Sequence, residues 1–272
     1  MESNEKTFGG LKLSGFLMLF MLFILLVCSV LLFTLNIWWG FLLGILGLVK
    51  FFICLFGFMQ VEPNDGRVMV FFGKYKGTIK ENGFFWVNPF YEKKKITLRA
   101  RNLDVPPIKV NDKVGNPVMI GLVLVWRVKD TYKAMFDIDS SSLAMPAINT
   151  SDKQHPSAVN IAGGALMGRM NNFERFVKIQ SDSALRSVAG LYAYDNQENG
   201  DEVTLRSGNK LVNERLEEEL TNRLSIAGME VVEARINYLA YASEIAGVML
   251  RRQQADAIIA AREKIVEGAV SM

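Results

Sequence analysis

Two long apolar stretches dominate the first 60 residues of the chain. Residues 13–49 contain no charged side chain, and residues 13–35 alone exceed the roughly 20 apolar residues that a helix needs to cross a bilayer. The second stretch, residues 37–59, is interrupted only by Lys50. The pattern predicts a polar N-terminus at 1–12 and a membrane segment at 13–60, built as two helices or a hairpin. We expect the anchoring side chains along both stretches to be Leu13, Phe20, Leu26, Leu35, Trp38, Trp39, Leu48 and Phe52.

The basic residues predict how this segment is oriented. Lys6 and Lys12 precede it, Arg67 and Lys74 follow it, and the connector at 35–40 is uncharged. Since cytoplasmic flanks carry an excess of Lys and Arg, both ends are expected in the cytoplasm. If the second stretch does not cross, the soluble body moves to the other side. The apolar core is too long for a cleaved signal peptide, so we expect an uncleaved anchor in a cell membrane, the inner membrane for a bacterial source.

Strand patterns fill residues 61–130. Apolar runs at 68–72 and 83–91 are followed by alternation at 96–101, and residues 114–117 form a turn. At 118–128 both faces carry apolar residues, which predicts a central strand: one face holds Val118, Ile120, Leu122, Leu124, Trp126 and Val128. This region is the β-rich first half of the soluble part.

A second, αβ half is expected at 131–241. A short helix at 131–136 precedes residues 139–170, which have no strong period and are interpreted as an inserted loop. Helical spacing begins at Asn171 and recurs at 212–224, where Gly228 is the expected C-cap. Alternation at 232–238 predicts one more strand. The fold class is therefore α+β.

The last segment, residues 242–272, predicts a helix of about 40 Å from residue 243 to 268. A long amphipathic helix after the last core strand is typical of a contact between subunits, and the alternative is a helix folded back on its own domain. The expected interface residues are Ile245, Val248, Met249, Ile258, Ile259 and Ile265.

Few residues are of the types and spacing that catalysis or metal binding needs. Cys28 and Cys54 lie inside the apolar stretches, and the single histidine, His155, cannot form a His-based zinc site or, without a Gly-x-Ser-x-Gly elbow, a convincing triad. Glycines 163, 164 and 168 lack the Gly-Lys-Ser/Thr ending of a phosphate loop. We therefore predict no catalytic, cofactor-binding or metal-binding residue, and an enzyme is not expected. A Ser–Lys hydrolase stays open only because both residue types are plentiful.

The net charge and the positions of the lysines limit the classes of partner that the chain is expected to bind. The net charge of +3, without a basic face or tail, does not indicate a nucleic-acid binder. The lysine run at 93–95, with Lys74, Lys76 and Lys80, either faces anionic lipid or forms an ordinary solvated turn.

The order of these motifs resembles the SPFH superfamily of stomatin, prohibitin and flotillin. The similarity is carried by GRVMVFFGK at 66–74, GFFWVNPF at 83–90, WRVKD at 126–130, SALRSVA at 183–189, LYAYD at 191–195 and the LRRQQADA…AREK pattern at 250–264. It covers roughly residues 60–268.

The resemblance implies a non-enzymatic, membrane-anchored homo-oligomer without cofactors. Such scaffolds organise membrane microdomains and confine or regulate membrane proteins, including membrane-anchored AAA proteases. Three departures stand out: the membrane segment is double, 139–170 looks inserted, and the final helix is short for a closed cage. A dedicated regulatory subunit of one membrane protease or transporter is the main alternative.

Overall fold

The computed structural model describes residues 5–34, 38–137, 161–195, 203–207 and 209–271. The chain divides into two compact units that alternate along the sequence. The first consists of Met1–Ala100, Arg127–Asn171 and Ile226–Glu230, and the second of Arg101–Trp126, Asn172–Ser225 and Val231–Met272. The predicted halves, 61–130 and 131–241, do not coincide with these units, because the long strands that precede residue 130 pair with a strand from near the C-terminus.

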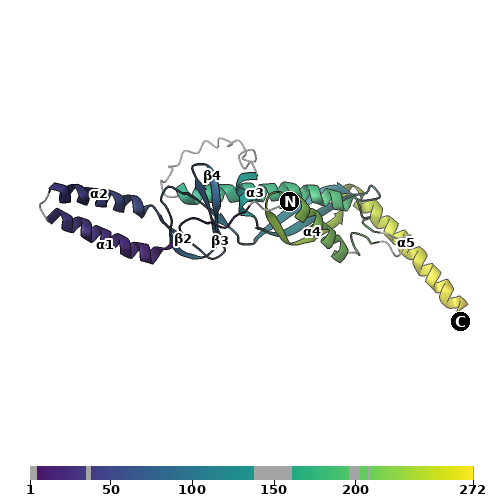
Figure 1. The fold of residues 1–272 in the computed structure, drawn as a ribbon. Coiled ribbons are helices and arrows are strands. Elements are labelled where there is room, and N and C mark those ends of the chain that lie inside the picture. The colour runs from purple at the N-terminus through teal and green to yellow at the C-terminus, as the bar shows by residue number, and fades with distance from the viewer. Residues whose placement is uncertain (1–4, 35–37, 138–160, 196–202, 208, 272) are drawn as a thin grey trace, which may run out of the picture. The chain divides into compact units, whose positions relative to one another are not determined.

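The first unit begins with a helical hairpin. Helices α1 (Gly15–Thr34) and α2 (Trp38–Leu55) lie side by side and antiparallel (Figure 1). Short strands flank them: β1 (Leu13–Ser14) precedes α1 and β2 (Phe58–Val61) follows α2, and both pair with β5 (Gly83–Trp86). Both ends of the hairpin are thus held by one strand. Leu13, predicted within the apolar helix, lies in β1 because this pairing precedes the first helical turn.

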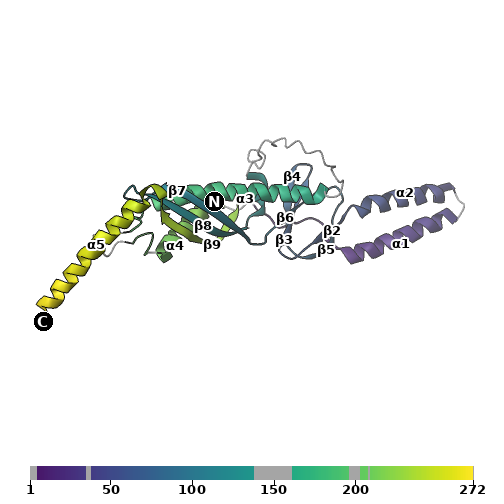
Figure 2. The same cartoon turned by 180° about the vertical axis from the view of Figure 1, so that it is seen from behind.

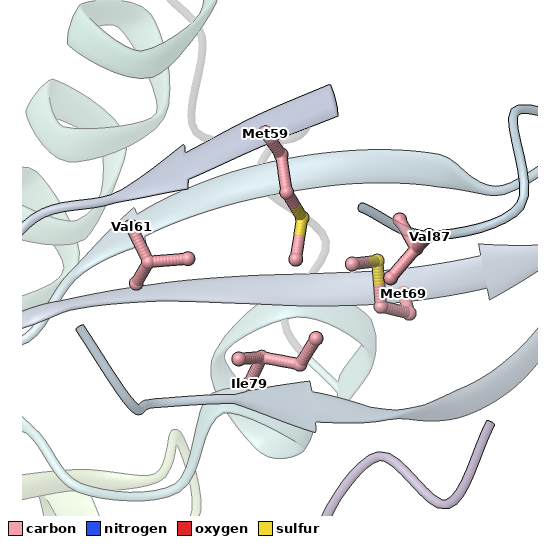
Figure 3. Close-up of a cluster of buried hydrophobic side chains, with 5 residues drawn as sticks. All are labelled: Met59, Val61, Met69, Ile79 and Val87. Carbon is pink, nitrogen blue, oxygen red and sulfur yellow. The ribbon is translucent and has the colours of Figure 1, made fainter. Parts of the chain in front are cut away.

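A second small sheet has the strand order β4-β3-β6, from β3 (Asp65–Phe71), β4 (Lys74–Ile79) and β6 (Glu92–Thr97). The two small sheets share a core of the buried side chains Met59, Val61, Met69, Ile79 and Val87 (Figure 3). Strand β6 ends at Thr97, so the predicted strand at 96–101 is wrong in its bounds. The backbone N–H of Leu98 donates instead to the carbonyl of Asn64, outside the ladder.

The largest sheet has the order β7-β8-β9, from β7 (Arg101–Asn111), β8 (Pro117–Val128) and β9 (Met229–Tyr241) (Figure 2). The prediction that 118–128 is a central strand is confirmed. The alternate residues of its predicted apolar face, from Val118 to Val128, are all buried in the core. The prolines at 106 and 107 fall in β7, an edge strand, where a missing N–H is tolerated and the register shifts between Val105 and Ile108.

One short π-helix and three longer α-helices complete the described chain: η1 (Lys133–Asp137), α3 (Ile161–Ala189), α4 (Asn209–Ser225) and α5 (Ser243–Val270). Helix α3 begins ten residues before the predicted start, so the part of the predicted loop 139–170 from Ile161 onward is helical. Its alanines and methionines are strong helix formers that outweigh its glycines. The rest of that predicted loop, residues 139–160, lies outside the described residues. At 133–137 the helix is π-type rather than α.

Gly228, the expected C-cap, lies three residues after the end of α4 at Ser225 and is in the left-handed region, with φ of 67°. A Cβ there would lie 2.4 Å from the carbonyl oxygen of Asp130, so a larger residue is excluded. Because the two segments approach so closely, the carbonyl oxygen of Gly228 accepts hydrogen bonds from the backbone N–H groups of Lys129 and Asp130. The α+β fold class is confirmed.

Candidate membrane-anchoring site

The outer face of the hairpin is apolar and exposed. Phe20 and Phe52 are 64% and 61% exposed, and Leu26 and Leu48 are half-buried. Leu35 lies outside the described residues, and Trp38 and Trp39 begin α2 although the structure does not describe their side chains. So large an exposed apolar surface is typical of a membrane-interacting segment.

The two helices differ in how well they fit a bilayer. The window Gly15–Leu32 is long and apolar enough to cross one, whereas the apolar part of α2, Gly40–Leu55, is shorter. At 1.5 Å per residue, α1 measures about 30 Å and α2 about 27 Å. Lys50 is exposed and five residues from the end of α2, so its ammonium group is within snorkelling reach of the interface.

Small residues hold the helices together. The Ser29 hydroxyl, buried in the hairpin, donates a hydrogen bond of 2.7 Å to the carbonyl oxygen of Gly44. A Cβ on Gly47 would lie only 3.1 Å from the Ser29 hydroxyl. Close packing with an interhelical hydrogen bond is how membrane helices associate.

The carboxyl end of α2 is fixed to the sheets. The Trp86 indole Nε1 donates to the carbonyl of Cys54 at 2.8 Å, and the Lys93 ammonium donates to the carbonyl of Phe56 at 2.7 Å. Gly57 is required at this junction because a Cβ there would lie 2.2 Å from Trp86 Nε1. Partners for the last carbonyls of α2 satisfy groups that water would otherwise have to solvate.

The segment before α1 is fixed to the same unit. The Phe8 N–H donates to the Thr78 carbonyl at 3.2 Å, and the Thr78 N–H donates to the Lys6 carbonyl at 2.9 Å. The Glu5 carboxylate accepts from the Thr131 hydroxyl and from Lys80. The residues before the hairpin and the sheets after it therefore belong to one folded body, so the two ends of the hairpin lie on the same side of it.

The lysine run at 93–95 has three different environments. Lys95 forms ion pairs with Asp65 at 2.7 Å and Glu62 at 3.3 Å, and Lys94 pairs with Glu92 at 3.3 Å. Lys93 is half-buried, and burial followed by the nearby Arg67 lowers its pKa. Hydrogen bonding to Asp65 is the largest of the effects that raise the pKa of Lys95. The run is therefore neither a uniform basic surface nor a simple solvated turn.

Helix α5 contains no buried residue. Of the predicted interface residues, Val248, Ile258, Ile259 and Ile265 are 56–70% exposed, and Ile245 and Met249 are half-buried. The alternative of a helix folded back on its own domain is not what the structure has. At 3.6 residues per turn the six residues fall on two faces, with Ile258 and Ile265 about a third of a turn from the other four.

The described residues offer no cluster of metal-binding side chains. Among them, no group of three or more His, Cys, Asp or Glu side chains is placed to hold a metal ion. Cys28 and Cys54 are free thiols. The glycines at 163, 164 and 168 lie within α3 rather than in a loop, and His155 lies outside the described residues.

Comparisons with known proteins agree with this architecture. The model of the SPFH domain / Band 7 family matches residues 60–269. An uncharacterized protein of Methanothermobacter thermautotrophicus is 32% identical over 79 residues, which are 29% of this chain and 24% of that protein. The chain thus matches about a quarter of the relative's length.

Proposed function

The chain belongs to the SPFH domain / Band 7 family, and we propose that it is a membrane-anchored, homo-oligomeric scaffold. Proteins of this family are typically membrane-associated scaffolds and are generally not enzymes. The proposal depends on two observations: the helical hairpin exposes a large apolar surface, and α5 exposes apolar side chains along a helix that has no buried residue. The first supplies attachment and the second supplies self-association.

The hairpin supports attachment from one face of the membrane. Residues 5–8 and strand β2 flank the hairpin, and each pairs with a strand of the first unit. Basic residues lie on the same flanks, which favours the cytoplasmic face. The soluble part is thus cytoplasmic in this proposal, whether the hairpin spans the bilayer or dips into it.

The two apolar faces of α5 support lateral assembly. A helix with one apolar stripe is satisfied by a single partner, whereas two stripes can contact a neighbour on either side. When one face of each subunit contacts the other face of its neighbour, the repeated contact generates a ring or an open array. Many anchors joined in one array bind the membrane far more firmly than one anchor alone.

A double substitution on α5 tests assembly. Ile258→Asp with Ile259→Asp places a carboxylate on each apolar face and should reduce the particle to a monomer, measured by mass and particle imaging in native lipid particles. Membrane attachment, measured by resistance to carbonate extraction, should persist. The matched control, Ala246→Asp with Ala257→Asp, adds the same charge on a third face and should assemble normally.

The result that contradicts assembly is a double variant with the mass of the unaltered protein. If the unaltered protein itself is a monomer or dimer, the scaffold proposal is wrong and a dedicated regulatory subunit of one membrane protein becomes the better account.

For the scaffold we propose a client among integral membrane proteins, such as a membrane-anchored AAA protease. Co-purification of such a protease with the assembled protein, and its loss with the Ile258 and Ile259 variant, tests that step.

A further inference from the structure

An apolar pocket opens where the hairpin meets the sheets. Its volume is about 410 Å³, within the range of about 300–1,000 Å³ that is usual for ligand sites. Leu19, Leu22, Phe23 and Leu26 form one wall, at the i, i+3, i+4, i+7 spacing of a single face of α1. Phe58 of β2 and Phe84 of β5 close one end, and two side chains of α2 complete the lining, so every lining residue is apolar.

The closed end is rigid. The rings of Phe58 and Phe84 stack with centroids 5.4 Å apart and planes 6° from parallel, and Phe16 meets Phe84 edge-on at 5.4 Å. Gly15 permits this arrangement, because a Cβ there would lie 2.2 Å from the Phe84 ring. The pocket is therefore a formed site with a fixed end, unlike the open outer surface of the hairpin.

The position of the pocket identifies the chemistry of its occupant. From Leu19 to Leu26 it extends about 10 Å along α1, into the part of the hairpin that we place in hydrocarbon. An apolar cavity of this kind does not hold water, and a peptide backbone would bring polar groups without partners. A lipid acyl chain fills it with neither cost.

Two cations lie beside the strand that closes the pocket. Lys93 Nζ is 3.5 Å from the carbonyl oxygen of Phe58 and the Arg67 guanidinium is 3.2 Å from that of Gln60. Both side chains are half-buried, and in the part of the chain that the structure describes neither forms an ion pair, unlike the neighbouring Lys94 and Lys95. An anion placed near both would relieve their mutual repulsion.

We propose that the pocket and this cation pair bind one anionic phospholipid, with an acyl chain between α1 and α2 and the phosphate group at Lys93 and Arg67. This inference rests on the proposed membrane anchoring. The lipid would act as a structural ligand that joins the hairpin to the sheets. Two cations near the phosphate correspond to a preference of about 30-fold for an anionic over a zwitterionic lipid.

Native mass spectrometry of the full chain tests the proposal. The protein is reconstituted in vesicles of equal parts phosphatidylglycerol and phosphatidylcholine, extracted, and the retained lipid is identified. One phosphatidylglycerol per chain is expected. Leu19→Trp fills the pocket and should abolish retention, whereas Leu17→Trp should not, since both leucines are 54% exposed on α1 but only Leu19 lines the pocket.

The headgroup contact is tested by a second matched pair. Lys93→Gln with Arg67→Gln should remove the preference for phosphatidylglycerol, and Lys74→Gln with Lys76→Gln, the same charge change at exposed positions, should keep it. Equal retention in the two leucine variants, or equal retention of both lipids by the unaltered protein, overturns the proposal. Resistance to carbonate extraction is measured in parallel, so that a failure of anchoring itself is distinguished from a failure of lipid selection.

Discussion

Replacing Lys95 with methionine should destabilise the first unit far more than the same change at Lys94. The Asp65 side chain is only 4% exposed and its carboxylate lies 2.7 Å from Lys95 Nζ. Lys94 instead pairs with Glu92, which is 63% exposed. The two lysines are adjacent on β6, so the comparison isolates the burial of the carboxylate partner.

The magnitude follows from that burial. Removing one partner of a fully buried ion pair costs about 3–5 kcal/mol, because the remaining charge is left without compensation. Lys95 is itself 29% exposed, so water screens the pair and we expect a loss of about 2 kcal/mol for Lys95→Met. An exposed pair contributes about 0.2–1 kcal/mol, so Lys94→Met should cost no more than about 0.5 kcal/mol.

Amide hydrogen exchange of the full chain in lipid nanodiscs measures both losses locally. The free energy of opening at the β3 and β6 amides should fall by about 2 kcal/mol in Lys95→Met and hardly change in Lys94→Met. Equal losses in the two variants would refute the argument that a buried carboxylate sets the cost.

The pH dependence supplies a second check on the same residue. Because the pKa of Lys95 is raised above its ordinary 10.5, its contribution to stability is fully present below pH 10.5 and is lost as the pH rises through the raised pKa. The difference between the unaltered protein and Lys95→Met should therefore be constant near neutral pH and shrink only in strong alkali.

Three further predictions concern other parts of the chain. Asp112→Ala should cost about 3 kcal/mol and speed amide exchange at its partners, because this buried carboxylate accepts backbone hydrogen bonds from Val114, Asn116 and Tyr194. Gly47→Leu should separate α1 from α2 at Ser29, measured as a longer distance between spin labels placed on the two helices. Burial, followed by nearby Asp195, raises the pKa of Tyr241 to about 12, so Tyr241→Phe should remove one late step from the alkaline absorbance titration. The stability that the neutral phenol contributes should be present below pH 10 and lost as the pH approaches 12.

Local patterns predicted what depends on local physics. The two-sided apolar pattern of β8 identified a central strand, and the spacing at 212–224 identified the helix α4. The bounds of α5 were predicted closely because no proline interrupts its residues. In each case the pattern that carries the prediction lies within the predicted segment itself.

Features that depend on distant residues were not predictable in this way. Three consecutive lysines look alike in the sequence, and only the strand register separates the partner of Lys95 from that of Lys94. Gly44 and Gly47 form a helix contact only because Ser29, on the other helix, lies opposite them. The sheet that begins with β7 and β8 is completed by β9, a hundred residues later, which no local pattern around residue 130 indicates.

The candidate lipid site combines both kinds of information. The spacing of Leu19, Leu22, Phe23 and Leu26 marks one face of a helix, but in an all-apolar segment every face looks equally suitable for lipid. This face is distinguished by Phe84, which lies about 60 residues later in the sequence, on β5, and closes the pocket. Because β5 pairs with both β1 and β2, the strand that fixes the two hairpin ends also shapes the pocket between the helices. A substitution that weakens β5 pairing should therefore reduce lipid retention without removing a single pocket residue.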